Sequence, residues 1–244
     1  MRYSFGLFLL VAGSCSPIYF PNSHNVPTFS KGGEFQGNIQ AQLSTPFSSG
    51  VQAQAAYSLN DHIAVIGNYG YFQARAGGRS NLGEVGMGYF ANPSAKQHTS
   101  IFAGYGVSES DLQINDSFYG TLYPDTVLTK HNARQLLSRY SKFFVQPAYG
   151  LLFSNRVHLI FSLKASRIDF DNFYSRDTEQ LRMPHGATYH FEPAATLKLN
   201  FPNVNLGLLL QWGVHLTGDK QIQDSNIARF AFGLQWRLTP KKKE

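Results

Sequence analysis

The sequence predicts an all-β chain that folds as one antiparallel up-and-down transmembrane β-barrel of about ten strands, with short periplasmic turns and long extracellular loops. Three observations support this prediction. Apolar and polar residues alternate with period two, as side chains on opposite faces of a strand do. The alternating segments run for about 9–12 residues, which matches a tilted membrane crossing better than the short strands of soluble sheets. Short and long connections also follow one another along the chain, as in outer-membrane barrels.

Composition excludes several other classes of protein. Only 15% of the 244 residues are charged, against roughly 25% in an average soluble domain. No run approaches the roughly 18 consecutive apolar residues that a membrane-spanning helix requires. Helical membrane proteins, coiled coils and disordered tails are therefore excluded. The basic residues that raise the sequence pI to about 9.4 are scattered, so nucleic acid is not expected as a partner.

Residues 1–14 have the features of an export signal, with Arg2 followed by a short apolar run at 5–12. The next residue, Cys15, is the only cysteine and stands where bacterial lipoproteins are cleaved and lipidated. We therefore expect a lipoprotein-type signal peptide and a covalent lipid on Cys15, with no other cofactor. Ala12 occupies a position where that class usually has Leu. The alternatives are a cysteine without a role or cleavage without lipid.

Residues 15–32 are rich in Pro and Asn and are expected to form a linker on the periplasmic side of a barrel at 33–240. This linker would connect the lipid to the barrel and is placed to plug its lower mouth. An even number of strands puts both termini in the periplasm, where 241–244 would form a basic tail.

Five strands are expected in the first half of the chain. Each has one apolar face and one face of small or uncharged polar residues, and turn-forming residues separate them. They span 35–43, 51–59, 63–71, 85–89 and 101–107.

Five more strands are expected in the second half, with the same two faces. They span 143–151, 157–165, 191–199, 204–216 and 227–238. Before them, residues 131–144 carry apolar residues at helical spacing, and this segment is either a short loop helix or an extension of the sixth strand.

Two features favour a membrane barrel over a soluble barrel with apolar residues inside. Aromatic residues fall at the expected periplasmic strand ends, as an interfacial girdle requires. The polar faces carry Gln, Asn, Gly and Ser rather than Lys and Glu, which suits a narrow polar lumen. The aromatic residues are Phe35, Tyr57, Tyr89, Phe153, Phe201 and Trp236.

Charged residues on the expected inner faces predict a polar network across the lumen, because buried charge is tolerated mainly when it is paired. The network is expected to include Glu84, Lys164, Glu192, Lys198, Arg229 and Arg237, with Lys142, His158, His190 and His215 on the same faces. The alternative is a small anion-conducting or proton-linked pore, since basic residues are in excess.

An enzyme is not expected, and no catalytic residue is assigned. Omptin proteases are ten-stranded barrels with carboxylates and a histidine at the outer rim, and the comparable residues here would be Asp169, Asp171, His185 and His190. Their spacing is not diagnostic. The histidines also lack paired ligand spacing, so no metal site is expected.

The long connections at 108–140 and 169–189 carry aromatic residues that can serve as binding anchors or can pack the loops over the barrel mouth. These aromatic residues are Phe118, Tyr119, Tyr123, Phe173 and Tyr174.

The N-terminal third resembles a group of small Bacteroidota outer-membrane barrel lipoproteins. The resemblance rests on Ser14-Cys15, on the Pro/Asn-rich segment up to Gly33-Glu34, and on Gln54 to Tyr57 followed by Asp61-His62-Ile63. It implies a lipid-anchored outer-membrane barrel and carries no established catalytic residues. We therefore expect a structural, binding or accessory role, with membrane lipid and other outer-membrane proteins as partners. A channel and a loop-sited hydrolase are the alternatives.

Overall fold

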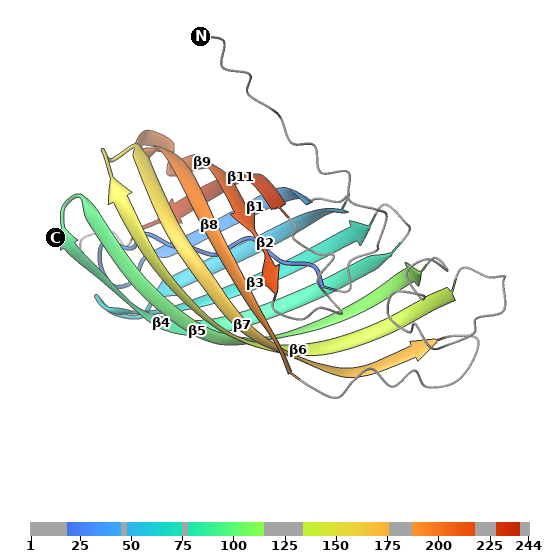
Figure 1. Ribbon diagram of the computed structural model, residues 1–244. Coiled ribbons are helices and arrows are strands. Elements are labelled where there is room, and N and C mark those ends of the chain that lie inside the picture. Colours follow the sequence, from blue (N-terminus) through green and yellow to red (C-terminus); the bar gives the residue numbers. More distant parts are fainter. Residues whose placement is uncertain are drawn as a thin grey trace, which may run out of the picture.

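The computed structural model describes residues 19–44, 48–74, 78–114, 134–175, 187–217 and 228–239. These residues form a closed antiparallel β-barrel (Figure 1). Its strands are β1 (Phe35–Ser44), β2 (Ser48–Ser58), β3 (Ile63–Ala74), β4 (Arg79–Ser94), β5 (Gln97–Ile114), β6 (Arg134–Leu152), β7 (Val157–Ser175), β8 (Ala187–Phe201), β9 (Leu206–Val214), β10 (Leu216–Thr217) and β11 (Ala228–Leu238). Because β10 continues β9 beyond His215, the barrel has ten strands, as predicted.

Each strand pairs with its neighbour in the sequence, and the ring closes where the last strand meets the first. Phe35 of β1 lies opposite Leu238 of β11, and Ser44 lies opposite Arg229. On its other edge β11 pairs with β9, and β9 pairs with β8. The predicted fold class is therefore confirmed. None of the described residues belongs to a helix that is long and apolar enough to cross a membrane.

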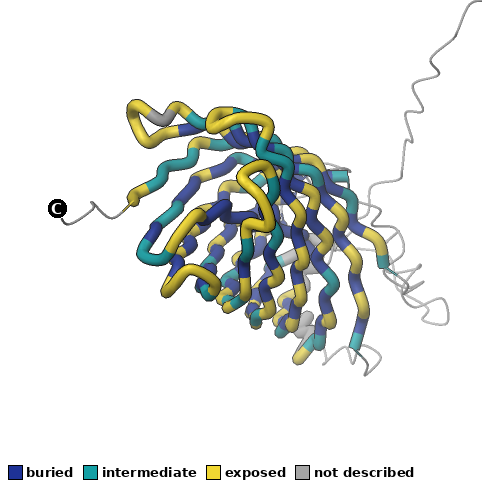
Figure 2. The backbone as a smooth tube through the Cα atoms, turned by 90° about the vertical axis from the view of Figure 1, so that its left-hand side faces the viewer, coloured by how far each residue is buried: buried dark blue, intermediate teal, exposed yellow. Residues whose placement is uncertain are grey.

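The predicted faces of the strands are also confirmed. Along each strand buried and exposed residues alternate (Figure 2). Large apolar side chains point outward, with Ile39 57% exposed and Leu234 60% exposed, while polar side chains such as Gln40 and Gln52 are buried inside. A soluble barrel would have the opposite arrangement, because burial of apolar surface stabilises folding in water.

The two ends of the barrel differ. The connections 59–62, 95–96, 153–156 and 202–205 lie at one end, with the start of β1 and the end of β11. We call this the short-turn end. At the last of these turns a 3₁₀ turn, Pro202–Val204, leads to Asn205 in the left-handed region with φ 54°. The connections 45–47, 75–78, 115–133, 176–186 and 218–227 join strands at the other end, which we call the long-loop end.

Several strands are longer than the predicted 9–12 residues. β5, β6 and β7 have 18, 19 and 19 residues and extend furthest toward the long-loop end, at the right of Figure 1. We call their extensions, residues 108–114, 134–141 and 167–175, the projecting wall. Its outer face carries the ion pair between Arg139 and Glu109, whose side chains are 65% and 68% exposed. From Arg134 onward the ambiguous segment 131–144 is therefore strand and not helix.

Residues 19–29 lie inside the barrel and Ser30 lies at its short-turn mouth, and we call residues 19–30 the lumen segment. All residues from Tyr19 to Phe29 are buried. Phe29 belongs to an apolar cluster with Ala56, Ala64, Ile66, Phe90, Phe102 and Phe144, and Val26 packs with Ala148 and Ile160. The described part of the predicted linker 15–32 is thus mostly an internal element of the barrel.

The lumen segment follows β1 in the opposite direction. The carbonyl of Pro21 lies at the level of Gln42, and Thr28 lies at the level of Gln36. Seven steps of the segment therefore cover six strand residues, or about 20 Å, which corresponds to a nearly extended chain. Tyr19 consequently lies toward the long-loop end, and Ser30 lies at the short-turn end, where it contacts Glu34.

Candidate functional site

The interior of the barrel is the candidate functional site, because polar and charged side chains from most strands converge on the lumen segment there. The period-two alternation of each strand directs every second side chain inward. A charged cluster lies near Tyr19, and glutamine side chains line the segment from Pro21 to Thr28.

Glu84 on β4 is the first centre of the charged cluster. Its carboxylate lies 2.9 Å from the Lys142 ammonium and 3.1 Å from the Lys164 ammonium. It also accepts hydrogen bonds from the side-chain amides of Asn68, at 2.9 Å, and Asn22, at 2.7 Å. Because Asn22 belongs to the lumen segment, the segment takes part in satisfying this buried carboxylate.

Glu192 on β8 is the second centre. Its carboxylate pairs with Arg229 of β11 and lies 3.6 Å from the Lys142 ammonium. The Tyr19 hydroxyl donates to Glu192 at 2.7 Å and accepts from the Lys142 ammonium at 2.6 Å. Lys142 thus joins the two carboxylates, and Tyr19 bridges it to Glu192.

The charged cluster contains three cations and two carboxylates, all of them buried. Burial of a charge is costly unless it is paired, and each of these five groups has at least one partner of opposite charge. The structure therefore brings together four residues of the predicted network, and Lys142 joins them. The four predicted residues are Glu84, Lys164, Glu192 and Arg229.

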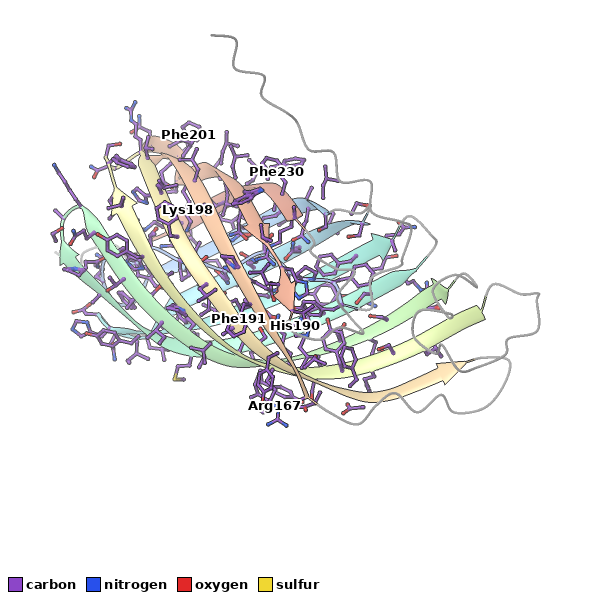
Figure 3. The ribbon with its side chains drawn as sticks, in the orientation of Figure 1. Arg167, His190, Phe191, Lys198, Phe201 and Phe230 are labelled. Carbon is purple, nitrogen blue, oxygen red and sulfur yellow. The ribbon has the colours of Figure 1, made fainter. Side chains whose placement is uncertain are left out.

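Lys198 and Arg237, which were predicted in the same network, lie nearer the short-turn end. The Lys198 ammonium donates to the Val26 carbonyl at 2.7 Å, inside the lumen. Arg237 pairs with Glu34 and donates to the Ser30 hydroxyl at 3.0 Å. Figure 3 shows Lys198 nearer than His190 to the end of β8 marked by Phe201.

Glutamine side chains bind the backbone of the lumen segment, a role that the sequence analysis missed. Gln211 accepts from the N–H of His24 at 2.7 Å and donates to the carbonyl of the same residue at 3.1 Å. Gln36 makes the same pair of bonds with Thr28, at 3.1 and 2.9 Å. Both groups of the peptide are satisfied, as they would be in a sheet.

Further glutamines bind the backbone of the segment at Pro21, Ser23 and Asn25. The N–H of Ser23 donates to Gln52 at 2.9 Å, and Gln54 donates to the Ser23 carbonyl at 2.8 Å. Gln42 donates to the Pro21 carbonyl at 2.8 Å, and Gln146 donates to the Asn25 carbonyl at 2.7 Å. The high Gln content of the inner faces was the sequence signal for this role, but it was interpreted only as a polar lumen.

The residues of the omptin-like set that the structure describes are not brought together. Asp169 pairs with Arg167 on the outer face of β7, where Figure 3 shows Arg167 directed away from the barrel. His190 is buried inside the barrel and lies 2.6 Å from His215, measured between ring nitrogens. Asp171 is exposed, and His185 lies outside the described residues. Within the described ranges, no three His, Cys, Asp or Glu side chains are grouped as metal ligands would be.

The remaining predicted site residues lie at or beyond the limits of the described chain. Cys15, Phe118, Tyr119 and Tyr123 lie outside the described residues. Phe173 and Tyr174 lie at the C-terminal end of β7, on the projecting wall, where only the backbone is described. Their roles as a lipidation site and as binding aromatics stay predictions.

The chain matches no protein-family model, and no curated protein matches it in sequence. Among solved structures it is similar to the translocator domain of the autotransporter NalP from Neisseria meningitidis, with 9% identity over 88% of this chain and 90% of that chain, and a TM-score of 0.53. Similarity to the KdgM porin (11% identity, 84% and 99% coverage, TM-score 0.42) and to the outer membrane protease OmpT from Escherichia coli (9%, 85% and 95%, TM-score 0.43) is weaker. The likeness to the translocator domain shows an outer-membrane β-barrel fold and nothing finer.

Proposed function

We propose that this protein is a closed outer-membrane barrel that acts as a binding or accessory subunit of a larger outer-membrane assembly. One observation carries the proposal: the lumen segment runs through the interior from the charged cluster to the short-turn end, and its residues 19–29 are buried there. Ten strands enclose little space in any case, since open aqueous channels need nearer sixteen. With its lumen occupied in this way, the barrel has its outer surfaces and loops available to bind partners.

The projecting wall is the surface that we assign to partner binding. It extends one side of the barrel beyond the other strands, as Figure 1 shows. A groove of about 550 Å³ lies where the wall adjoins β3 and β4. Glu109, Leu137 and Arg139 line it from the wall, and Tyr71 and Arg79 line it from β3 and β4. Apolar and charged side chains side by side are typical of a polar protein–protein interface.

Purification from native membranes in mild detergent tests the accessory role. We expect stoichiometric partner proteins to copurify with the wild type and to be lost with Arg139→Glu on the projecting wall. Arg156→Glu, at an exposed turn of the short-turn end, is the matched control and should keep them. A lone monomer from native membranes would contradict the proposal.

The orientation that we propose places the short-turn end in the periplasm, because outer-membrane barrels have short periplasmic turns. Trypsin added to intact cells should then cut the 176–186 connection, which contains Arg176 and Arg182, and should spare Arg156 until the cells are lysed. The reverse pattern would show that the barrel is inverted.

We further propose that Cys15 is lipidated and that its lipid lies on the long-loop side. Tyr19 binds Lys142, which is ten residues, or about 33 Å of strand, from the short-turn end of β6. Cys15 precedes Tyr19 by four residues, a reach of about 14 Å at most. With the lumen segment in place, a lipid on Cys15 does not reach the short-turn side, where the sequence analysis expected it. Mass spectrometry of the mature N-terminus should find acylated Cys15, and an unmodified N-terminus would overturn this proposal.

A channel is the second candidate function, and the excess of basic groups in the lumen favours it. The full-length protein in planar bilayers should be electrically silent if the accessory role is right. Stepwise conductance that falls with Arg229→Ala would instead support a pore.

A further inference from the structure

The interior of the barrel has the properties of a peptide-binding site. Carbonyl groups of the lumen segment accept hydrogen bonds from glutamine or lysine side chains at Pro21, Ser23, His24, Asn25, Val26 and Thr28. Backbone N–H groups donate to glutamines at Ser23, His24 and Thr28. Main-chain hydrogen bonds of this kind give affinity when an extended peptide adds to a sheet, while pockets give specificity.

The wall of the barrel does not depend on the lumen segment for its own backbone pairing. Every strand pairs with two neighbours, including β1 with β11, so the ladder of hydrogen bonds is closed without the segment. The segment contacts the wall chiefly through side chains that reach inward. The segment is therefore bound as a ligand is bound, inside a wall whose strands already pair with one another.

Side chains of the segment supply specific anchors in addition to the backbone contacts. Phe20 stacks on Phe72 with ring centroids 5.9 Å apart, and Phe29 enters its apolar cluster. Tyr19 and Asn22 complete the charged cluster. An occupant of this site is therefore an extended polypeptide with an aromatic residue near each end and polar residues between them.

We propose that the lumen is a receptor for an extended polypeptide. Glutamine side chains of the barrel wall recognise the peptide backbone, and residues 19–30 are an exchangeable occupant of the receptor. This function is separate from the partner-binding role of the projecting wall. It also holds whether or not Cys15 carries a lipid.

The test uses the full-length protein, folded with its own segment in place. A recognition sequence for a specific protease is inserted after Lys31, which is exposed, and the chain is cut there after folding. A fluorescent synthetic peptide of residues 19–31 is then added in excess. We expect the cut segment to stay bound at first and then to exchange for the labelled peptide, with one peptide per barrel.

Backbone recognition is tested with peptides in which one amide is replaced by an ester, since this removes an N–H without adding bulk. An ester at His24 should weaken binding roughly threefold to tenfold, as the loss of one hydrogen bond does. An ester at Phe20 is the control, because the described contacts place no glutamine on the backbone there. On the barrel, Gln211→Leu should weaken binding at least as much as the His24 ester, because it removes both hydrogen bonds to His24. Gln40 is buried but bonds Asn38 and Gln54 rather than the segment, so Gln40→Leu should leave binding unchanged.

Three results would overturn the proposal. The first is that the cut segment and the labelled peptide do not exchange until the barrel is unfolded, which would make the segment a permanent part of the core. The second is that the peptide does not bind after the cut segment has left. The third is that the peptide with the ester at His24 binds as tightly as the unmodified one, which would exclude recognition of the backbone. This last measurement uses the barrel without the Gln211 substitution and so does not depend on the folding of that variant.

Discussion

Glu84 shows how closely the charges of the lumen depend on one another. Its carboxylate faces two ammonium groups, from Lys142 and Lys164, and none of the three side chains is exposed. Removal of one member of a buried ion pair leaves the other charge without compensation in a medium that solvates it poorly. The cluster is therefore most sensitive to loss of a carboxylate, because cations already outnumber carboxylates.

We expect Glu84→Gln to lower the free energy of unfolding by about 3–5 kcal/mol, the usual cost of breaking a buried pair. Urea titration of the protein in lipid vesicles, followed by tryptophan fluorescence, measures this change. Glu109→Gln is the matched control, since Glu109 pairs with Arg139 at 2.6 Å but both side chains are exposed. Glu109→Gln should lower the free energy of unfolding by less than about 1 kcal/mol. Equal effects of the two substitutions would show that the cluster does not hold the barrel together.

At this scale the sequence predicted which face a residue occupies but not its height in the barrel. Period two placed Glu84, Glu192 and Lys198 on inner faces, and the structure confirms this for each of them. Height depends on the register between strands, which periodicity does not specify. Lys198 and Arg237 were therefore grouped with residues that lie nearer the long-loop end of the lumen.

Among the elements, β4 and β5 pair closely because glycines face inward along them. A Cβ at Gly104 would lie 2.2 Å from the Val85 carbonyl oxygen and 2.6 Å from Phe144 Cζ. A backbone oxygen cannot move aside as the end of a flexible side chain can. The small residue is therefore required by close approach and not by backbone conformation.

Gly104→Ala should destabilise the barrel by about 1–3 kcal/mol through overpacking. Gly67→Ala on the outward face of β3 provides the comparison, since a Cβ there meets nothing within 4 Å. The midpoint of thermal unfolding of both variants in the same detergent tests the difference. Similar midpoints for the two variants would mean that β4 and β5 separate at little cost.

Strand number and faces were predictable at the scale of elements, but strand length was not. Alternation of apolar and polar residues arises where one face meets lipid, and it weakens where β5, β6 and β7 leave the apolar belt. Their extensions carry Glu109, Arg139 and Arg167 on the outer face, so the sequence there resembles a loop. The pairing of Ile114 with Arg134 shows that the strands continue.

For the whole molecule, the outward apolar belt predicts that a charge introduced on it lowers the free energy of unfolding by an amount that depends on its depth in the membrane. Phe232 lies midway along β11 and is 49% exposed, whereas Leu238 is the last residue of that strand and is 58% exposed. We expect Phe232→Arg to cost about 2–4 kcal/mol and Leu238→Arg about 0–1 kcal/mol, as for charges at the midplane and at the interface of other barrels. Reversible folding into lipid vesicles measures both values. Equal costs would contradict a membrane-spanning position of β11.

The extent of the occupied lumen was the largest feature that could not be predicted, since the linker was expected to plug only the lower mouth of the barrel. Residues 19–30 show neither period two nor period 3.6, because their side chains meet the wall on all sides. A linker was the interpretation that composition alone supported. The glutamines that receive the segment come from positions as distant as Gln36 and Gln211, and no local pattern indicates that they share one ligand.

The position of the lumen segment also determines the order of assembly. Closure of the ring joins Phe35 to Leu238, which are 203 residues apart (238 − 35), and pairings of such long range form slowly. The segment contacts side chains of β1, β8 and β11, on both sides of that seam, and is enclosed once the seam forms. We therefore expect residues 19–30, which are tethered next to β1, to bind β1 and β8 while the sheet is still open and curling. Closure of the seam then completes the contacts of the segment with β11.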